Sequence, residues 1–561
     1  MTTMIAKKTN HYMKGLVALA APVIVAAGLL AASAMPAHAA ATTFTVNQTG
    51  DPGDGLCNAT CTLRDAIVSA NSNPGADTIN FNVSNGSGGL VQFNLLDELP
   101  AITEQVTING YSQPGSSVNT REDSSEGINA NPMIVLNGAS AGSDADGLVI
   151  TGSNTVVKGL RIQDFKGVGI QLPNAVSGVK IEGNHITDNG DTFDRGGVAL
   201  TDGARSNIIG GSTPAQRNLI SGNFGSGVSI IGNGSSLSNQ VVNNVIGANT
   251  QGNGSQSNRG DGVTIVGSSS NRVERNNIAF NLGNGVGIDD FSNNTTNNSI
   301  RQNSIVSNAA EGIDLGLDGP TANDQDDADV GANDLQNFPV ITSATNEGGK
   351  TTIAGTINSV PNTRVSVEFF SNPANTDEGR QLLGFTSVTT NSGGDASFAF
   401  ESPQPVSAGA NVTATATQFA LTDFGTIFRD TSEFSAPRSV VAAADTTAPT
   451  VQSIVPANKA TGVARTADVK ATFSEAMNAG TITAATFKLK EAGASNFVQA
   501  PVSYDAAAKR ATLNPSTDLK AGTTYVVKVT TGAEDLAGNQ LDQNPNRAGN
   551  QAKSWRFTTG Q

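Results

Sequence analysis

Short apolar segments recur between polar turns from residue 146 to residue 336. One recurring segment is a glycine followed by small aliphatic residues, at Gly167, Gly197, Gly227, Gly262, Gly285 and Gly312. A second segment begins with asparagine and ends with isoleucine, at Asn184, Asn218, Asn244, Asn276 and Asn303. Successive asparagines are separated by 34, 26, 32 and 27 residues. The pattern predicts repeated units of two or three short strands with turns between them.

A single unit of this kind cannot bury its few Val and Ile side chains, so the units are expected to stack. Stacked turns pair at roughly 4.8 Å, the spacing of neighbouring strands, and share one aliphatic core. The equivalent asparagines then lie above one another and are expected to form an inward ladder of amide hydrogen bonds. A disordered tract rich in Asn and Gly is the alternative, and the repeated aliphatic pairs disfavour it. The expected fold resembles a right-handed parallel β-helix of the pectin-lyase-like kind.

Residues 40–145 are expected to form the first turns of this coil and to close its open end, because an unpaired end would recruit other chains. A strand begins at Phe44, and a helix follows with Thr62 as its expected N-cap. The helix carries apolar residues on one face, at Leu63, Ala66, Ile67 and Ala70. This amphipathic helix is the predicted N-terminal cap.

Two cysteines, Cys57 and Cys61, precede the helix and are the only ones in the chain. In an exported protein they are expected to form a disulfide, with free structural thiols as the alternative. A disulfide that closes so short a loop contributes about 2 kcal/mol on the chain-entropy model. The segment CTLRDAI, residues 61–67, resembles the Cys-Ser-Leu-Arg-Glu-Ala (CSLREA) motif of many bacterial exported β-helix proteins, with Thr62 for Ser and Asp65 for Glu. The resemblance implies an architecture for residues 42–336 and says little about activity.

After the repeats, side chains alternate at period two between turns rich in Gly, Pro and Asn. Residues 337–440 are therefore expected to form an Ig-like antiparallel β-sandwich. Residues 441–448 are interpreted as a linker. Residues 449–561 resemble the Ig-like domain of bacterial S-layer proteins (SbsA-like), most clearly in FSEAM at residues 473–477 and DLAGN at residues 535–539. The expected fold class is all-β: a β-helix with one cap helix, followed by two Ig-like sandwiches.

The first 39 residues predict a secretion signal. They contain three lysines, an apolar stretch from Gly15 to about Leu30, and a small-residue cleavage site, AHA, at residues 37–39. A membrane anchor is the alternative. Removal of this segment takes the formal net charge from −15 to −18, because it holds three Lys and no acid. So acidic a chain disfavours nucleic acid and anionic lipid as partners. No transmembrane segment is expected in the mature chain, and the expected location is secreted, extracellular or at the cell surface.

The composition restricts the kinds of catalytic site that the chain can form. His185 is the only histidine outside the signal segment, so a His-centred triad would have to use it. A zinc site with several His or Cys ligands cannot be assembled from the remaining residues. We expect His185 to be an exposed strand residue and Trp555, the only tryptophan, to be a core residue. A bound metal would be a hard cation held by oxygen atoms.

Acidic residues concentrate between the last repeat and the first sandwich. Residues 302–349 hold nine acids and no Lys or Arg. Aligning GVGIDD with EGIDLG places Asp289 and Asp314 in register on adjacent turns, where two carboxylates repel unless a cation or a proton intervenes. The predicted ligands of a structural calcium ion are Asp289, Asp314, Asp318, Asp324, Asp326, Asp327 and Asp329. The EF-hand spacing does not fit, and a solvated acidic linker is the alternative.

These features favour an exported, non-catalytic, modular surface protein that adheres to or interacts with polysaccharide of the cell surface, envelope or matrix. The alternative is a polysaccharide lyase or glycoside hydrolase that acts along the β-helix. Its candidate residues are Asp289 with Asp290, or Asp202 with Arg195 and Arg205, although each is also typical of a turn. No segment resembles the motifs of polygalacturonases, and a shared fold does not confer activity. No catalytic residue is therefore assigned.

Overall fold

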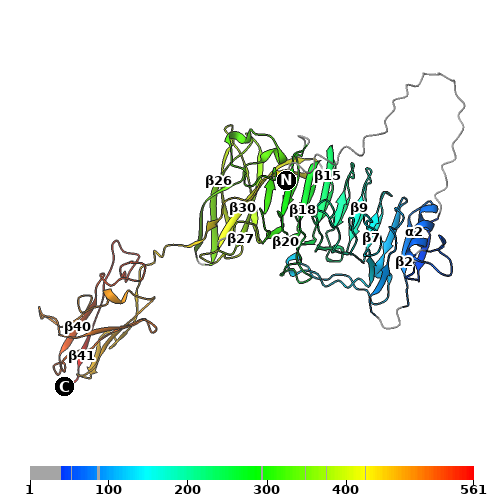
Figure 1. The fold of residues 1–561 in the computed structure, drawn as a ribbon. Coiled ribbons are helices and arrows are strands. Elements are labelled where there is room, and N and C mark those ends of the chain that lie inside the picture. The colour runs from blue at the N-terminus through cyan, green and yellow to red at the C-terminus, as the bar shows by residue number, and fades with distance from the viewer. Residues whose placement is uncertain are drawn as a thin grey trace.

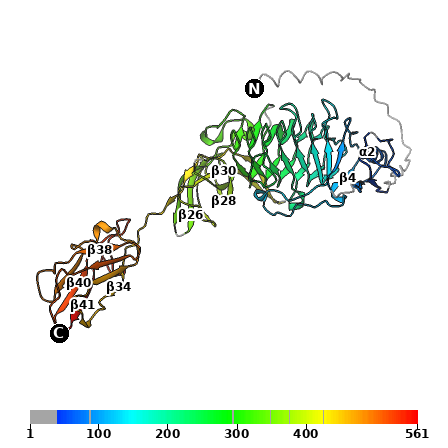
Figure 2. The same ribbon diagram turned by 60° about the horizontal axis from the view of Figure 1, so that its bottom comes forward.

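The computed structural model describes residues 40–51, 53–84, 89–291, 295–347, 349–374, 376–423 and 425–561. The expected signal segment, residues 1–39, lies outside the described residues. Within them the chain is all-β with one α-helix, as the sequence predicts. It forms a β-helix, a sandwich packed against the end of the β-helix, and a second sandwich that follows a linker (Figures 1 and 2).

Three parallel sheets run the length of the β-helix. The first sheet contains β1 (Thr43–Val46), β2 (Asp77–Phe81), β4 (Val106–Asn109), β7 (Val156–Lys158), β10 (Lys180–Glu182), β13 (Ile208–Gly210), β16 (Gln240–Val242), β19 (Arg272–Glu274) and β22 (Ser299–Arg301). The second contains β3 (Val91–Asn94), β5 (Ile134–Asn137), β8 (Leu160–Gln163), β11 (His185–Thr187), β14 (Leu219–Ser221), β17 (Val245–Ile246), β20 (Asn277–Ala279) and β23 (Ser304–Val306). The third contains β6 (Leu148–Val149), β9 (Ile170–Leu172), β12 (Val198–Leu200), β15 (Val228–Ser236), β18 (Val263–Ser269), β21 (Val286–Asp289) and β24 (Ile313–Leu315).

The inward positions of the strands hold aliphatic side chains that lie directly above one another. In the first sheet one such column is Ile181, Ile209, Val241, Val273 and Ile300. All five are at most 3% exposed. Full burial of such a side chain stabilises the fold by about 1.5–3 kcal/mol relative to an exposed one. The stacked columns therefore form the continuous core that no single turn could form alone.

Inward asparagines form ladders at the turns between sheets, as the sequence predicts. Asn218 Oδ1 accepts hydrogen bonds from the main-chain N–H of Asn184 at 2.9 Å and from its Nδ2 at 3.3 Å. The expected ladder is Asn184, Asn218, Asn244, Asn276 and Asn303. Two further ladders are Asn189, Asn223, Asn258, Asn281 and Asn308, and Asn207, Asn239, Asn271, Asn298 and Asn333. These amides satisfy backbone groups that the turns leave buried and unpaired.

The helix α2 (Leu63–Ser72) closes the N-terminal end of the β-helix (Figure 1). Its buried face contains the four predicted apolar residues, which join the core. Thr62 is the N-cap, and its side chain and that of Asp65 form a reciprocal capping box. A disulfide joins Cys57 and Cys61 just before the helix, as predicted.

The first sandwich lies against the opposite end of the β-helix (Figure 1). Its strands are β25 (Val340–Glu347), β26 (Lys350–Asn358), β27 (Arg364–Asn372), β28 (Gln381–Thr389), β29 (Asp395–Ser402), β30 (Asn411–Thr422), β31 (Gly425–Thr431), β32 (Arg438–Ser439) and β33 (Val441–Ala442). One sheet has the order β29-β26-β25-β33, and the other has the order β28-β27-β30-β31 with β32 beside β30.

Carboxylates of this sandwich hold the last turn of the β-helix. Glu433 accepts hydrogen bonds from the main-chain N–H groups of Leu315, at 3.0 Å, and Thr321, at 2.8 Å. Buried Glu368 forms an ion pair with Arg301 at 2.7 Å. The carboxylates that accept from backbone of the last turn are Glu368, Glu378, Asp430 and Glu433. Side chains of the next domain thus supply the partners that another turn would have supplied.

The four carboxylates are costly to ionise in this position. The pKa of Glu433 is raised to about 7, chiefly by burial and to a smaller extent by nearby Asp314 and Glu311, despite the two main-chain hydrogen bonds that lower it. Burial likewise raises the pKa of Asp430 to about 6. These four acids, which lie outside the acid-rich segment 302–349, are therefore structural acceptors at a domain joint.

The C-terminal sandwich follows a linker (Figure 2). Its strands are β34 (Val451–Val455), β35 (Ala460–Val463), β36 (Val469–Phe473), β37 (Phe487–Glu491), β38 (Val502–Asp505), β39 (Arg510–Leu513), β40 (Thr524–Val529) and β41 (Lys553–Thr559). Trp555 is 3% exposed and packs near Phe487, which confirms the prediction of a core residue. The described 3-10 helices are η2 (Gly110–Ser112), η3 (Ser124–Glu126), η4 (Pro214–Gln216), η5 (Gln325–Asp327), η6 (Ala332–Leu335) and η7 (Ala479–Thr481).

Candidate functional site

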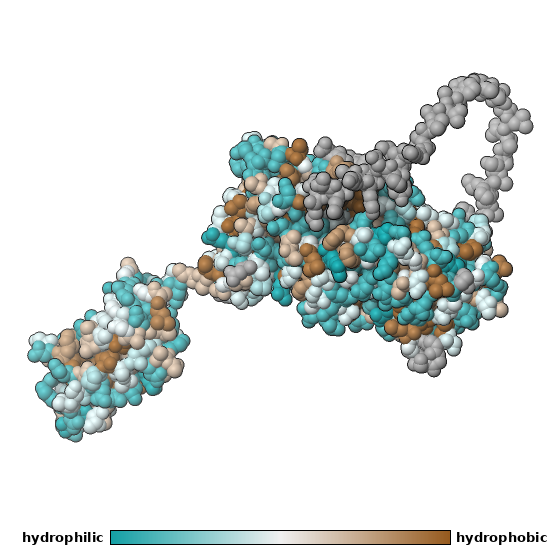
Figure 3. Space-filling model, in the orientation of Figure 1, coloured by the Kyte–Doolittle hydropathy of each residue, from teal (hydrophilic) through white to brown (hydrophobic). Residues whose placement is uncertain are grey.

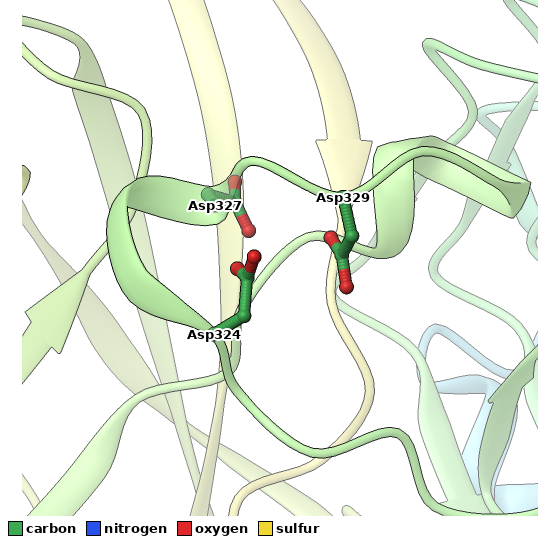
Figure 4. Close-up of side chains that lie close together, drawn as sticks. All are labelled: Asp324, Asp327 and Asp329. Atoms are coloured by element: carbon green, nitrogen blue, oxygen red, sulfur yellow. The ribbon is translucent and has the colours of Figure 1, made fainter.

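Three of the seven aspartates predicted as calcium ligands lie together in the loop between the β-helix and the first sandwich. Asp324, Asp327 and Asp329 each offer a carboxylate oxygen, and these oxygens lie within 4.8 Å of one another. The three side chains point toward a common centre (Figure 4). Asp327 is fixed by hydrogen bonds from the main-chain N–H of Asn337, at 2.7 Å, and from Ser359 Oγ, at 3.1 Å.

The electrostatics of this aspartate group are unfavourable without a counter-charge. Burial, followed by repulsion from Asp329 and Asp324, raises the pKa of Asp327 to about 6 despite its two hydrogen bonds. Burial and then Asp324 also raise the pKa of Asp329. One buried oxygen of Asp329, Oδ1, accepts no hydrogen bond from the residues that the structure describes. Protons or a hard cation would relieve this repulsion, and carboxylate oxygens are the ligands that Ca²⁺ prefers.

The other four predicted ligands lie outside this group. Asp326 Oδ1 accepts a hydrogen bond from Gln325 at 2.8 Å. Asp314 Oδ2 accepts one from Asn284 at 3.1 Å. Asp289 and Asp318 border a separate cavity of 330 Å³. The loop therefore brings Asp324, Asp327 and Asp329 together, while Asp326 of the same loop makes other contacts and Asp289, Asp314 and Asp318 lie at the last turns of the β-helix.

The expected register of Asp289 with Asp314 is wrong. Strands β21 and β24 pair Val286 with Ile313, which places Asp314 opposite Gly287 and leaves Asp289 two residues further along. In the observed register Val286 stacks on Ile313 and Ile288 on Leu315, whereas the expected register would place Val286 opposite Glu311 and Leu315 opposite Asp290. Asp289 has a raised pKa for a different reason, burial followed by repulsion from Asp290.

A second acidic group, which the sequence analysis missed, lies where the linker meets the C-terminal sandwich. Asp445, Glu475 and Asp535 offer oxygens within 4.8 Å of one another. Burial, then Asp445 and Asp535, raise the pKa of Glu475. Asp535 is 1% exposed and accepts hydrogen bonds from the main-chain N–H groups of Ala537 and Asn539, both at 2.8 Å. Two of these acids belong to FSEAM and DLAGN, so the motifs themselves carried the signal.

A groove of 1070 Å³, here called the polar groove, lies on the outer face of the second sheet. Asn277 of β20 and Ser304 of β23 contribute to its floor. Residues 122–125 of a long loop line one side, and residues 380–382 of the first sandwich line another. Arg275 adds a guanidinium. Amide, hydroxyl and charged groups therefore face a single cleft at the junction of β-helix and sandwich.

Arg217 holds the loop that forms one wall of the polar groove. Its side chain is fully buried and donates hydrogen bonds to four main-chain carbonyls, those of Arg121, Glu122, Asp123 and Gly127. It also donates to Asn243 Oδ1 at 2.8 Å and 3.1 Å. Burial lowers the pKa of Arg217, and nearby acids of the loop oppose this. No local sequence signal marks this residue, because its partners lie about ninety residues earlier in the chain.

His185 is buried, and the expectation that it is exposed is wrong. It is 4% exposed, and burial followed by Arg161 lowers its pKa to about 3, so the imidazole is neutral. Its strand neighbour Leu219 packs against Ile128 of the long loop, which covers this part of the second sheet. The residue does point away from the core, but a segment distant in sequence lies over it. A neutral, covered histidine is a structural residue in this setting.

Of the residues considered for hydrolysis or lyase chemistry, Arg195, Asp202 and Arg205 lie in connections between strands, whereas Asp289 is the last residue of β21 and Asp290 follows it. Arg195 pairs with Asp144 at 2.5 Å and with Asp191 at 3.1 Å. Asp202 accepts a hydrogen bond from Thr201 at 3.2 Å, and the backbone of Arg205 forms an isolated parallel β-bridge with Ser177 of the preceding turn. These contacts tie neighbouring turns together, which is the role that the sequence analysis set against catalysis.

Comparison with known families identifies the C-terminal part of the chain. Residues 445–559 match the family described as bacterial Ig-like domain. The match includes all three members of the second acidic group, Asp445, Glu475 and Asp535. A comparison with curated proteins found no match.

Solved structures give weak overall likenesses. The N-terminal part of the bacterial S-layer protein SbsC is 21% identical over 20% of this chain and 24% of that chain, with a TM-score of 0.16. ORF18 of Geobacillus virus E2 is 12% identical over 69% of this chain and 78% of its own, with a TM-score of 0.19. The tailspike gp49 of Acinetobacter baumannii bacteriophage Fri1, a capsular polysaccharide depolymerase, is 11% identical over 64% and 79%, with a TM-score of 0.14. The chain spans about a quarter of the SbsC fragment, and TM-scores this low carry no functional argument.

Proposed function

We propose that this chain is an exported surface protein whose β-helix binds polysaccharide in the polar groove. The observation that carries the proposal is the groove itself, which collects amides, hydroxyls and guanidinium groups on stacked strands. Sugar hydroxyls both donate and accept hydrogen bonds, so they match such a lining. Strands fixed by the asparagine ladders keep these groups in place, which lowers the entropy cost of binding.

Two features support recognition of an extended chain of sugars. The groove is open and runs between two walls that are far apart in the sequence, the long loop and the first sandwich. Phe280 and Leu382 add apolar surface beside the polar groups, which suits the C–H faces of sugar rings. On the face shown in Figure 3, hydrophobic residues are scattered among hydrophilic ones. Polar contacts repeated over several sugars are therefore the expected basis of affinity.

The modular arrangement supports a place outside the cell. The C-terminal residues match a bacterial Ig-like domain, and a β-sandwich after a linker is a suitable spacer or attachment unit. No helix in the part of the chain that the structure describes is long and apolar enough to cross a membrane. The cysteine pair suits an oxidising compartment.

A glycan array probed with the protein from residue 40 onward tests binding. We expect Arg380→Ala with Gln381→Ala to weaken binding at least tenfold, because both exposed side chains line the groove. Arg364→Ala, an exposed arginine near the other end of the sandwich strand β27, is the matched control and should bind normally. Binding that is unaffected by the double substitution would place the polysaccharide elsewhere.

A second candidate function is cleavage of the bound polysaccharide. It is favoured by one observation: Glu122 and Asp123 line the same groove as Arg275, so acids and a cation meet there. Assays for reducing ends and for unsaturated products on a polysaccharide panel decide between the candidates. Turnover that disappears in Glu122→Gln would establish an enzyme, and binding without turnover would favour a non-catalytic role.

We further propose that a structural calcium ion is held by Asp324, Asp327 and Asp329. The buried oxygen of Asp329 without a partner favours this assignment. Calorimetric unfolding should show a transition that moves to higher temperature with calcium in the wild type and in Asp326→Asn. It should not move in Asp329→Asn. An equal shift in both variants would refute the assignment.

A further inference from the structure

A second cavity, of 650 Å³, lies on the outer face of the first sheet, where the hairpin of β30 and β31 meets the β-helix. Three arginines line it: Arg272 of β19, Arg301 of β22 and Arg429 of β31. We call it the arginine pocket. Its basic lining contrasts with the net charge of the chain, which is −15.

Arg301 is the most buried of the three arginines. Its side chain is 8% exposed and forms an ion pair with Glu368 at 2.7 Å. The guanidinium also lies 3.4 Å from the centre of the Phe428 ring. Its Nε has no hydrogen-bond partner among the described residues. The protein thus fixes this cation at the pocket wall and leaves one buried donor unused, which points to a missing acceptor.

The other two arginines add positive charge that is only partly neutralised. Arg272 pairs with Glu274, whose other oxygen lies 3.6 Å from Arg275. Arg429 is exposed and forms no ion pair with a described residue. Burial raises the pKa of Glu368 although the charge of Arg301 lowers it, so burial disfavours the charged form of this carboxyl. The balance of the pocket favours an anion.

The remaining wall of the pocket indicates what carries the anionic group. It consists largely of short hydroxyl and amide side chains, together with one aromatic ring. They include Ser238, Gln240, Ser270, Ser299 and Phe428, and the carboxylate of Glu274, the partner of Arg272, also lines the pocket. Several of them project from neighbouring strands in register, since Gln240 pairs with Arg272 and Arg272 with Ser299. Hydroxyls and amides in this arrangement match the hydroxyls of a sugar ring.

We propose that the arginine pocket binds an anionic sugar, with its carboxylate or sulfate between Arg272, Arg301 and Arg429. Guanidinium groups bind such oxyanions through charge-assisted, often bidentate hydrogen bonds. The pocket opens from the first sheet, whereas the polar groove opens from the second, so the two sites are separate. The proposal goes beyond binding in the polar groove and stands or fails independently of it.

Isothermal titration calorimetry with four probes tests the proposal: glucuronate, glucose 6-sulfate, glucose and inorganic sulfate. We expect binding of at least one of the two anionic sugars, and at least tenfold weaker binding of glucose and of inorganic sulfate. Arg429→Gln should weaken the anionic sugar about tenfold or more, because it removes a charged donor without touching the buried ion pair. Arg364→Gln, at an exposed arginine that lines neither site, is the matched control and should bind as the wild type does.

Several results would overturn the proposal. Equal affinity for glucose would remove the role of the anion, and equal affinity for inorganic sulfate would remove the role of the sugar. Binding that is unchanged in Arg429→Gln would place the ligand outside the pocket, as would binding lost in Arg364→Gln. Circular dichroism of each variant verifies the fold, and Arg272→Gln provides a second exposed position at which the same loss is expected.

Discussion

Replacing Arg217 with methionine is expected to release the loop that forms one wall of the polar groove. Arg217 donates hydrogen bonds of 2.7–3.0 Å to four carbonyls of residues 121–127. Methionine has a long side chain without donors, so the core beneath stays filled while all four carbonyls lose this partner. The substitution therefore tests the hydrogen bonds rather than the packing.

The size of the effect follows from the number of bonds. A buried carbonyl left without a donor costs about 1–3 kcal/mol, and the lower value applies here because the loop lies at the surface, where water enters readily. For four carbonyls the substitution then destabilises the closed loop by about 4 kcal/mol. Local opening of the loop should become about a thousandfold more frequent, since each 1.4 kcal/mol is a factor of about ten.

Hydrogen exchange measured by mass spectrometry on peptides from residues 121–131 provides the assay. The amide of Ile128 is an informative reporter, because in the structure it donates to the carbonyl of Thr250 at 2.8 Å. Arg205→Met, at an exposed turn, is the control and should exchange as the wild type does. Exchange of this loop that is no faster in Arg217→Met than in the control would refute the reasoning.

Three further outcomes are expected. Raising the pH from 4.5 to about 7 should lower the unfolding temperature of the β-helix and first sandwich. Burial raises the pKa of Glu433, so the folded state binds this proton more tightly than the unfolded state does, and calorimetry across this range checks the sign. Asn244→Ala should destabilise the β-helix by about 2–4 kcal/mol in chemical denaturation, because it interrupts a ladder on both sides, whereas exposed Asn253→Ala should be neutral. Reduction of the Cys57–Cys61 disulfide should cost about 2 kcal/mol and speed exchange in α2 before the later turns.

The periodic features of the fold could be predicted from the sequence. Asn184 and its equivalents recur with aliphatic neighbours, and a residue type that recurs at the same place in each turn has one simple structural explanation. The helix at residues 63–72 was also predictable, because its cap and its apolar face are local. Both predictions rest on interactions between residues whose spacing the sequence itself displays.

The candidate sites were harder to predict, since they depend on contacts between distant segments. The burial of His185 requires a loop that begins about seventy residues earlier, and the chain gives no sign of where that loop will lie. An alignment of the acidic residues puts Asp289 opposite Asp314, whereas the stacking of Val286 on Ile313 and of Ile288 on Leu315 decides the pairing. The arginine pocket joins β19 and β22 to a hairpin more than a hundred residues further along the chain.

The carboxylates that hold the last turn of the β-helix also limit how the molecule can assemble. A coil of parallel strands could in principle lengthen by adding a turn from a second molecule, since its terminal strands offer unpaired N–H groups. Here Leu315, Gln302 and Asn297 already donate to Glu433, Glu368 and Asp430. Because α2 closes the opposite end, end-to-end stacking into fibres is blocked. The length of the β-helix is therefore set by a single chain.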